Sequence, residues 1–244
     1  MSGRWQNWKV LDWDCEVFRP TDPEARFGVL YLHDEAGGND LAVFEEELDR
    51  HGLWAVVPQC GPTWWLDKLV PSFHDEITPQ QFLRDHLVPR VRAELKIEPP
   101  CWGLVGHGMG GQGALKLAYV APTEFPVVAA IAPSVDFHLL MKEGHPVLAT
   151  VFEDVEAARQ YTPILHVHPL NWPRHQFFCC DPEDYFWFDS ADRLRMKLGS
   201  IGIAFEAELQ ESCEGDRAAY LRKMLPRALQ FAQERLDQHR RSLI

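Results

Sequence analysis

The sequence lacks features that would point to a membrane or nucleic-acid protein. No run approaches the roughly 18 apolar residues of a membrane-spanning helix, and no apolar signal core follows the N-terminus. Basic residues are scarce: 24 Lys and Arg against 36 Asp and Glu give a net charge of −12, which argues against nucleic acid and anionic membranes as partners. We therefore expect a cytoplasmic protein with neither kind of partner.

Paired cysteine spacing is also missing. The six cysteines show none of the spacings typical of a zinc site. In a reducing compartment, free and mostly buried thiols are expected. Nothing in the sequence calls for a metal or another cofactor.

Internal repeats and long polar linkers are absent, so residues 1–244 are expected to form one domain. Apolar runs alternate with segments of helical spacing, which predicts an α/β fold with a doubly wound, mostly parallel sheet and helices on both faces. The expected strands are 27–32, 54–57, 101–105, 127–132, 176–180 and 203–209. The expected helices are 41–51, 78–95, 112–120, 190–198 and 217–240.

Two segments lie outside this alternation. Residues 1–25 are expected to be an N-terminal extension with an edge strand, and residues 135–174 an irregular insertion over the sheet edge, with one helix near 153–159.

The clearest local signal opens the helix at 78–95. Thr78 fits the N-cap, Pro79 fits the first helical position, and Gln81 is placed to complete a capping box. A kink is expected at Pro89, which has no N–H to donate.

A glycine cluster follows the strand that ends at Val105. From Gly106 the chain reads G-H-G-M-G-G-Q-G-A-L. A strand, a tight turn and a helix form the setting of a nucleophile elbow, G-x-S-x-G, whose outer glycines permit close backbone contact and whose serine attacks. The outer positions are Gly106 and Gly110, but the central one is Gly108, so the attacking hydroxyl is absent.

Residues 109–115 resemble the elbow of the α/β-hydrolase fold, in the branch related to esterase D and S-formylglutathione hydrolase, where it commonly reads G-x-S-M-G-G-x-G-A-L. The resemblance extends over roughly residues 26–235. Its other matches are the L-H-x-x-x-G-G loop ending at Gly38 and the segments 151–152, 161–164 and 225–229. It implies an α/β-hydrolase fold without a large separate lid.

The resemblance also implies an acid after the strand 176–180. Matching the family's E-D pair places it at Asp184, with Asp181 as second choice. The role of this acid is to orient a catalytic imidazole.

The imidazole itself is missing. The base is expected in the loop after Leu209, but residues 210–217 contain no histidine, and the family position falls on Asp216 or, with a small shift, on Gly215 or Glu214. The nucleophile and the base are therefore both missing and only the acid is a candidate for retention, so no catalytic triad is intact. The triad-equivalent positions are Gly108, Asp184 and Asp216.

The loop that builds the oxyanion hole is altered too. The family's His-Gly is His33-Asp34 here, with Glu35 next, and carboxylates there disfavour a developing anion. We expect the remodelled pocket to be lined by His33, Asp34, Glu35, Met109 and Glu214. If the acidic residues converge, they form an acidic crater for a divalent cation or a ligand's cationic group; these residues are Asp34, Glu35, Asp184, Glu214 and Asp216.

Other nucleophiles lie on loops at the same edge of the sheet. The alternatives are Ser134, Cys60 and Cys213, but ordinary loop roles are expected for them. A cysteine needs a lowered pKa to attack, and the acidic residues around these loops would raise it.

The histidines outside the loop give weaker signals. His166 and His168 with nearby His175 offer zinc ligands without a fixed further ligand, so surface or packing roles are expected. His107 is expected to pack away from the pocket. The residues around it also match G-x-G-x-x-G, but no strand ending in Asp or Glu follows about 20 residues on, which disfavours a dinucleotide site.

These observations favour a catalytically degenerate relative of the esterase D-like enzymes that binds a small molecule or a protein partner. One alternative is an enzyme of changed chemistry that uses another nucleophile or a metal held by the acidic loops. The other is an interaction or structural protein, with a homo-oligomer as one form, whose contact includes Trp64-Trp65 or the Trp5, Trp8 and Trp13 segment.

Overall fold

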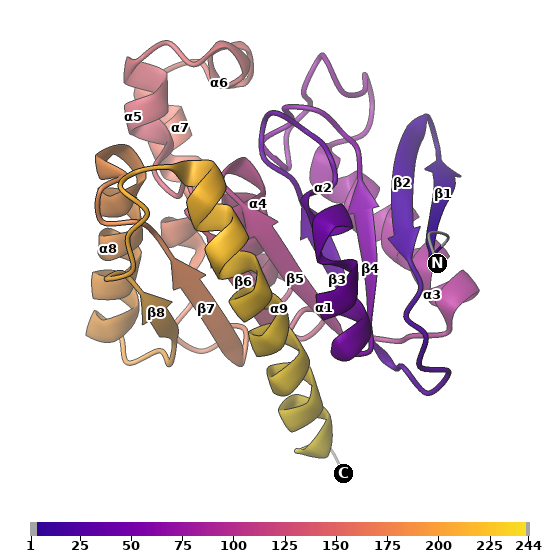
Figure 1. The fold of residues 1–244 in the computed structure, drawn as a ribbon. Helices are drawn as coiled ribbons and strands as arrows, with labels where there is room; N and C mark the ends of the chain where they lie inside the picture. Colours follow the sequence, from indigo (N-terminus) through magenta and orange to yellow (C-terminus); the bar gives the residue numbers. More distant parts are fainter. Residues whose placement is uncertain (1–3, 243–244) are drawn as a thin grey trace.

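The computed structural model describes residues 4–242, and in this range an eight-stranded sheet is covered by helices on both faces (Figure 1). The strand order is β1-β2-β4-β3-β5-β6-β7-β8. The bounds are β1 Trp5–Val10, β2 Trp13–Phe18, β3 Phe27–Leu32, β4 Leu53–Pro58, β5 Trp102–His107, β6 Val127–Ile131, β7 His175–Cys179 and β8 Glu206–Glu208.

The six neighbouring strands β4, β3, β5, β6, β7 and β8 run parallel to one another. The strands β1 and β2 form an antiparallel hairpin, and β2 pairs antiparallel with β4, so the hairpin extends the sheet at one edge. Every residue of β3, β5 and β6 is buried, which explains why these strands read as unbroken apolar runs. The predicted doubly wound α/β sheet is confirmed.

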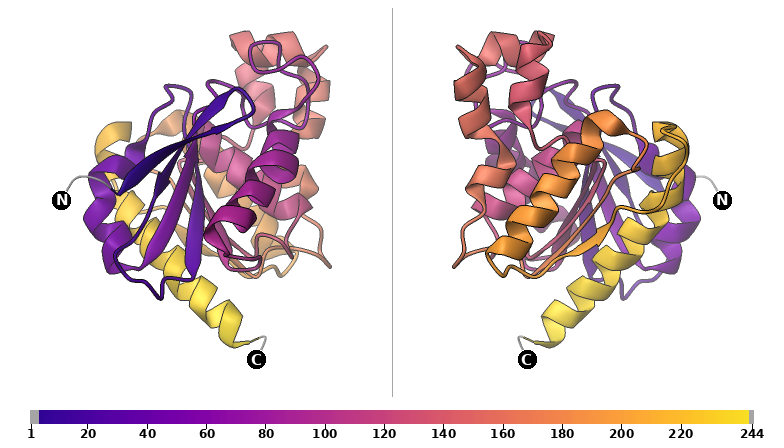
Figure 2. Two further views of the ribbon diagram at one scale, coloured as in Figure 1. Left: turned by 90° about the vertical axis from the view of Figure 1, so that its right-hand side faces the viewer. Right: turned by 90° about the vertical axis from the view of Figure 1, so that its left-hand side faces the viewer.

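The helices divide between the two faces of the sheet. One face is packed by the segment from α2 to α3, by α4 and by α8, and the other by α1 and α9 (Figure 2). Their bounds are η1 Asp40–Phe44, α1 Glu45–Arg50, α2 Pro79–Gln81, η2 Phe82–Leu87, α3 Val88–Leu95, α4 Met109–Val120, α8 Tyr185–Ser200 and α9 Arg217–Arg241.

The predicted capping box at Thr78 is present. The Gln81 backbone N–H donates to the Thr78 hydroxyl at 3.1 Å, and the Thr78 backbone N–H donates to the Gln81 side chain at 2.9 Å. The helix then passes through the π-helical segment η2 before α3 begins. This wider turn precedes Pro89, whose ring would clash with a carbonyl in regular α-geometry.

Residues 135–174 are more regular than expected. They hold α5 Phe137–Lys142, α6 Pro146–Val151, α7 Val155–Tyr161 and the 3-10 helix η3 Pro163–His166. The prediction of an irregular insertion was wrong for α5 and α6, because helices of six residues are too short to show a periodic pattern. This lobe stands beyond the carboxyl ends of the central strands (Figure 1). No helix within residues 4–242 has the length and apolar character of a membrane span.

Candidate functional site

The loop between β5 and α4 has the geometry of a nucleophile elbow. Gly108 adopts φ 55° and ψ −117° directly before α4. A Cβ on Gly106 would lie 2.3 Å from the Gly110 carbonyl oxygen, and a Cβ on Gly110 would lie 1.8 Å from the Leu32 carbonyl oxygen. The outer glycines are therefore required by close backbone contact, and the elbow is retained although its central residue carries no side chain.

The carboxylate of Asp34 fills the space above Gly108. The backbone N–H of Met109 donates to Asp34 Oδ1 at 2.8 Å. A Cβ on Gly108 would lie only 2.4 Å from the same oxygen. In an elbow, the N–H after the nucleophile forms half of the oxyanion hole. One carboxylate therefore occupies the place of the nucleophile and binds the oxyanion donor.

His33 holds this loop in place, and both nitrogens of its imidazole ring are hydrogen-bonded. The backbone N–H of Cys60 donates to Nε2 at 3.2 Å, so Nδ1 carries the proton and donates to the Asp34 carbonyl oxygen at 2.6 Å. Burial lowers the pKa of His33, which keeps its ring neutral. Both ring nitrogens are engaged, and the side chain acts as a structural link between the loops after β3 and β4.

Glu35 and Trp64 cover the elbow on the side of the lobe formed by residues 135–174. The indole N–H of Trp64 donates to Glu35 Oε1 at 2.6 Å, and His145 Nε2 lies 2.7 Å from the same oxygen. Burial would raise the pKa of Glu35, but the bonds from His145 and Trp64 lower it overall. The Trp64 backbone N–H also contacts Met109 Sδ at 3.1 Å. This bridge ties the β3 loop to the lobe and covers the elbow.

The predicted acid, Asp184, is buried and paired with an arginine. Arg217 Nε lies 2.7 Å from Asp184 Oδ2, and Arg217 Nη2 lies 3.1 Å from Oδ1. This bidentate guanidinium stands where an imidazole would be needed beside the acid. The position predicted to replace the base, Asp216, instead caps α9 by accepting the Ala219 N–H at 2.9 Å.

Asp181, the second choice for the acid, has a structural role. Its carboxylate accepts backbone N–H groups of Glu183, Cys213 and Gly215 at 2.8, 2.7 and 3.2 Å. Burial would raise its pKa, but these three bonds lower it. Glu214 lies beside this loop as an exposed residue with φ 58°. Asp181 therefore fixes the loop before α9.

The acidic residues do not form a common cluster. Each named carboxylate of the group except exposed Glu214 has a partner of its own, and no three His, Cys, Asp or Glu side chains within residues 4–242 are placed to share a metal ion. The crevice between Asp184, Arg217 and Gly215 is too narrow for a water molecule. In place of the expected crater, these carboxylates make separate contacts: Asp184 binds Arg217, and Asp34 and Asp216 accept backbone N–H groups.

The alternative nucleophiles are poorly placed for attack. Ser134 is fully buried, its backbone N–H lies 3.4 Å from the Gly108 carbonyl oxygen, and its hydroxyl has no hydrogen-bond partner among the described residues. Burial raises the pKa of Cys60 well above its usual value, which disfavours the thiolate. Cys213 lies in the loop held by Asp181.

The histidines named above take separate places. His107 is buried at the end of β5, and burial lowers its pKa. Burial also lowers the pKa of His166, and the pKa of His175 falls to about 4 through burial and nearby Arg235. Each therefore favours a neutral ring.

The tryptophans considered as an exposed contact are largely covered. Trp64 and Trp65 are 2% and 1% exposed, so the prediction that they form a contact surface was wrong. Both adopt positive φ, 52° and 47°, which turns the chain over the elbow. Trp13 stacks on Phe73 with ring centroids 4.8 Å apart.

Sequence reasoning missed three contributors. Arg217 and His145 were not singled out and Trp64 was considered only as part of an exposed contact, because each acts through a contact between distant segments. Only the bidentate fit of arginine to carboxylate offered a signal, and it needs the fold to be seen.

Comparison with known proteins agrees with this geometry. Residues 13–176, well over half of the chain, match the family described as "Putative esterase", and the chain belongs to that family. S-formylglutathione hydrolase from Agrobacterium tumefaciens is similar with a TM-score of 0.76 at 16% identity, over 95% of this chain and 94% of that one. Mycobacterium tuberculosis MPT51 (FbpC1) gives 0.76 at 14% identity, over 95% and 98%. S-formylglutathione hydrolase (FrmB) from Staphylococcus aureus gives 0.74 at 14%, over 94% and 97%. At these identities the likeness shows the shared α/β-hydrolase fold.

Proposed function

We propose that this chain is a non-hydrolytic member of its esterase family, a protein that keeps the fold and acts by binding. The observation that carries the proposal is the position of Asp34, whose carboxylate accepts the Met109 N–H at 2.8 Å and lies where a nucleophile at position 108 would stand.

Three steps of ester hydrolysis lack a group to perform them. Attack needs a hydroxyl, and Gly108 offers none. The oxyanion needs free N–H donors, and the Met109 donor is bound to a carboxylate. Proton transfer needs a base with a pKa near neutrality, and the partner of Asp184 is the guanidinium of Arg217, which stays protonated.

The same contacts favour a structural role for the former active site. The internal carboxylate on the elbow N–H takes the place that an anionic intermediate would take in an active elbow. Glu35, Trp64 and His145 then cover it. Binding to a small molecule or a protein partner is therefore proposed to occur elsewhere on the molecule. A cytoplasmic location stays a prediction.

The proposal is tested by hydrolysis of p-nitrophenyl acetate and S-formylglutathione. We expect no turnover above background from the natural protein, and none from Gly108→Ser, because the introduced side chain meets Asp34 and finds no base. An active S-formylglutathione hydrolase serves as positive control, and added Mg²⁺, Mn²⁺ or Zn²⁺ tests for metal-dependent chemistry. Turnover by the natural protein that persists through purification would overturn the proposal, and its loss in a Ser134→Ala variant would identify Ser134 as the nucleophile.

A further inference from the structure

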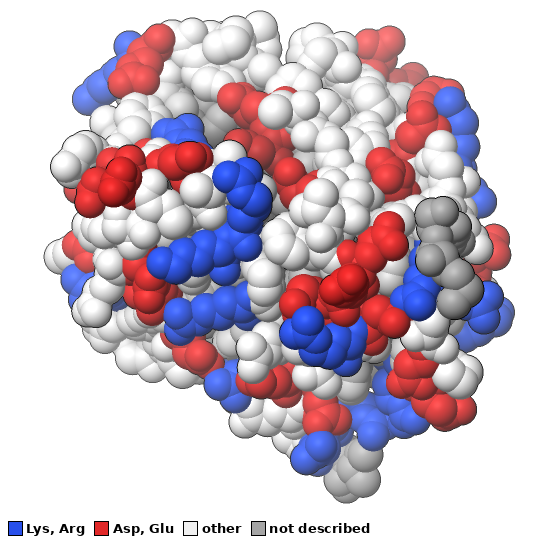
Figure 3. Space-filling model, in the orientation of Figure 1, with Lys and Arg blue, Asp and Glu red and all other residues white. Residues whose placement is uncertain are grey.

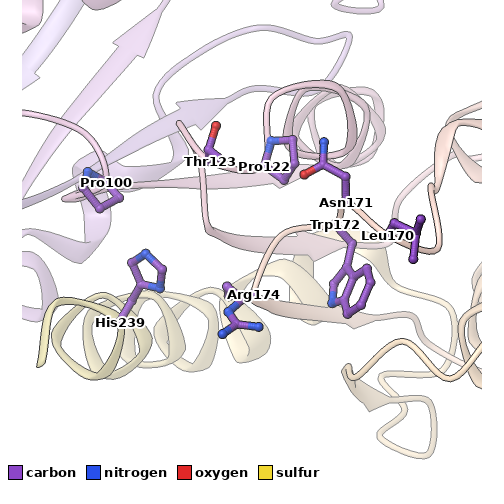
Figure 4. A pocket seen from close by; sticks show the side chains of 8 residues that line it. All are labelled: Pro100, Pro122, Thr123, Leu170, Asn171, Trp172, Arg174 and His239. Carbon is purple, nitrogen blue, oxygen red and sulfur yellow. The ribbon is translucent and has the colours of Figure 1, made fainter. Parts of the chain in front are cut away.

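A cavity of about 410 Å³ opens at the edge of the sheet opposite the elbow. Its walls come from four junctions far apart in the sequence: Pro100 before β5, Pro122 after α4, residues 170–174 before β7, and His239 near the end of α9 (Figure 4). Cavities of this size commonly hold small organic ligands. None of the groups discussed at the elbow lines it.

One part of the cavity wall is apolar and stiff. It consists of the rings of Pro100 and Pro122 and the half-buried indole of Trp172. The turn that leads into Trp172 is fixed, because the Asn171 N–H donates to the His168 carbonyl oxygen at 3.1 Å and the Leu170 N–H to His168 Nδ1 at 3.2 Å. A preorganised apolar wall favours a flat or branched hydrocarbon group.

The other part of the wall is cationic. Arg174 is exposed and lies between His239 and Trp172 in Figure 4. No carboxylate within residues 4–242 forms an ion pair with Arg174, whereas Arg235, nearby on α9, is paired with Glu206 at 2.6 Å. The rings of His175 and His239 meet edge to face at 6.1 Å, and burial followed by Arg174 lowers the pKa of His239. The local field is therefore positive.

That positive field contrasts with the rest of the molecule. The whole chain carries a net charge of −12, and basic side chains gather over α9 beside acidic ones on the face shown in Figure 3. Several of those on α9 are paired with carboxylates of β8, as in the pair of Arg227 with Glu208 at 3.0 Å. An unmatched guanidinium beside an apolar wall is suited to a carboxylate, which it binds with two parallel hydrogen bonds.

We propose that this cavity binds a small organic carboxylate with an aromatic or branched apolar body, the carboxylate on Arg174 and the apolar body against Trp172 and the two prolines. His239, neutral and at the cavity wall, supplies a further hydrogen bond. The proposal is independent of whether the elbow hydrolyses esters.

The test is calorimetric titration of the purified full chain with phenylacetate, phenylacetamide and acetate as probes. We expect saturable binding of phenylacetate at millimolar concentration or tighter, and binding at least about tenfold weaker for the neutral amide of the same shape and for acetate, which has the charge alone. Equal affinity for phenylacetate and phenylacetamide, or no saturation by about 10 mM phenylacetate, would overturn the proposal.

Variants assign the site. Arg174→Gln is expected to weaken phenylacetate about tenfold and leave phenylacetamide unchanged, while Trp172→Leu weakens both. Arg222→Gln is the matched control, because it removes the same charge from an exposed position on α9, about 25 Å along the helix from His239. Circular dichroism confirms that each variant is folded. Unchanged phenylacetate binding by Arg174→Gln, or equal losses in Arg174→Gln and Arg222→Gln, would contradict the assignment.

Discussion

The side chain of Asp34 occupies the volume that a serine at position 108 would need, and its oxygen accepts the N–H that would stabilise an oxyanion. We therefore expect positions 34 and 108 to be coupled, because the Asp34 carboxylate occupies the space that a side chain at position 108 would need. At the residue scale, this pair explains how the geometry of the elbow is kept with a glycine at its centre.

A double-mutant cycle tests this coupling. Gly108→Ser should lower the free energy of unfolding by about 1–3 kcal/mol, through a side chain at φ 55° and the displaced Asp34. Asp34→Gly in the same chain should recover part of that loss, because the clash is removed. Chemical denaturation of the single and double variants measures the coupling energy.

Gly144→Ser is the matched control for the cycle. Gly144 has φ 74° and nothing lies within 4 Å of its added Cβ, so it reports the backbone cost alone. Equal losses at positions 108 and 144, with no recovery from Asp34→Gly, would show that Asp34 and Gly108 are not coupled.

Single-residue roles divide into those that sequence could reveal and those that it could not. Gly108 was identified because its neighbours Gly106 and Gly110 keep the elbow pattern. Asp34 was placed in the altered loop, but its contact with Met109 was not predicted, because a hydrogen bond across 75 positions depends on how β3 lies beside β5.

At the scale of elements, α4 connects the elbow to the lobe through Lys116. This lysine is 3% exposed, its Nζ donates to the Tyr161 carbonyl oxygen at 3.3 Å, and it lies 4.1 Å from the centre of the Tyr161 ring. Burial lowers the pKa of Lys116 to about 7. A buried lysine at such a position destabilises the fold when its amine is protonated.

The pH dependence of stability tests this element contact. Between pH 7 and about 10.5 the unfolded chain binds the Lys116 proton more strongly than the folded chain, so stability rises with pH through that window. Lys116→Met should therefore be more stable than the natural protein at pH 7, by about 1–2 kcal/mol after allowance for solvent screening and the lost hydrogen bond. That advantage should shrink as the pH approaches 10.

Exposed Lys142→Met is the control and should change stability by less than about 0.5 kcal/mol at either pH. Thermal or urea unfolding at pH 7 and pH 10 gives both values. A pH-independent gap between Lys116→Met and the natural protein would contradict the assigned pKa.

Element prediction succeeded where the pattern was long or capped. The helix opening at Thr78 was predicted with its capping box, and the buried strands β3, β5 and β6 were predicted from apolar runs. The short helices α5 and α6 were missed, because their boundaries are set by tertiary contacts such as that of His145 with Glu35.

At the scale of the whole molecule, the sheet and its two layers of helices follow from alternation and from burial on both faces. The covering of the elbow does not follow from either. It depends on Trp64 and Glu35 meeting the lobe, and on Arg217 meeting Asp184, contacts between segments that local patterns do not relate.

The most direct test of the central claim is intact-protein mass spectrometry after incubation with a fluorophosphonate, which labels activated serine hydroxyls. We expect no adduct on the natural protein under conditions that label an active S-formylglutathione hydrolase completely. A stoichiometric adduct, mapped by peptide digestion to Ser134 or any other serine and abolished by its replacement with alanine, would show a working nucleophile and contradict the account.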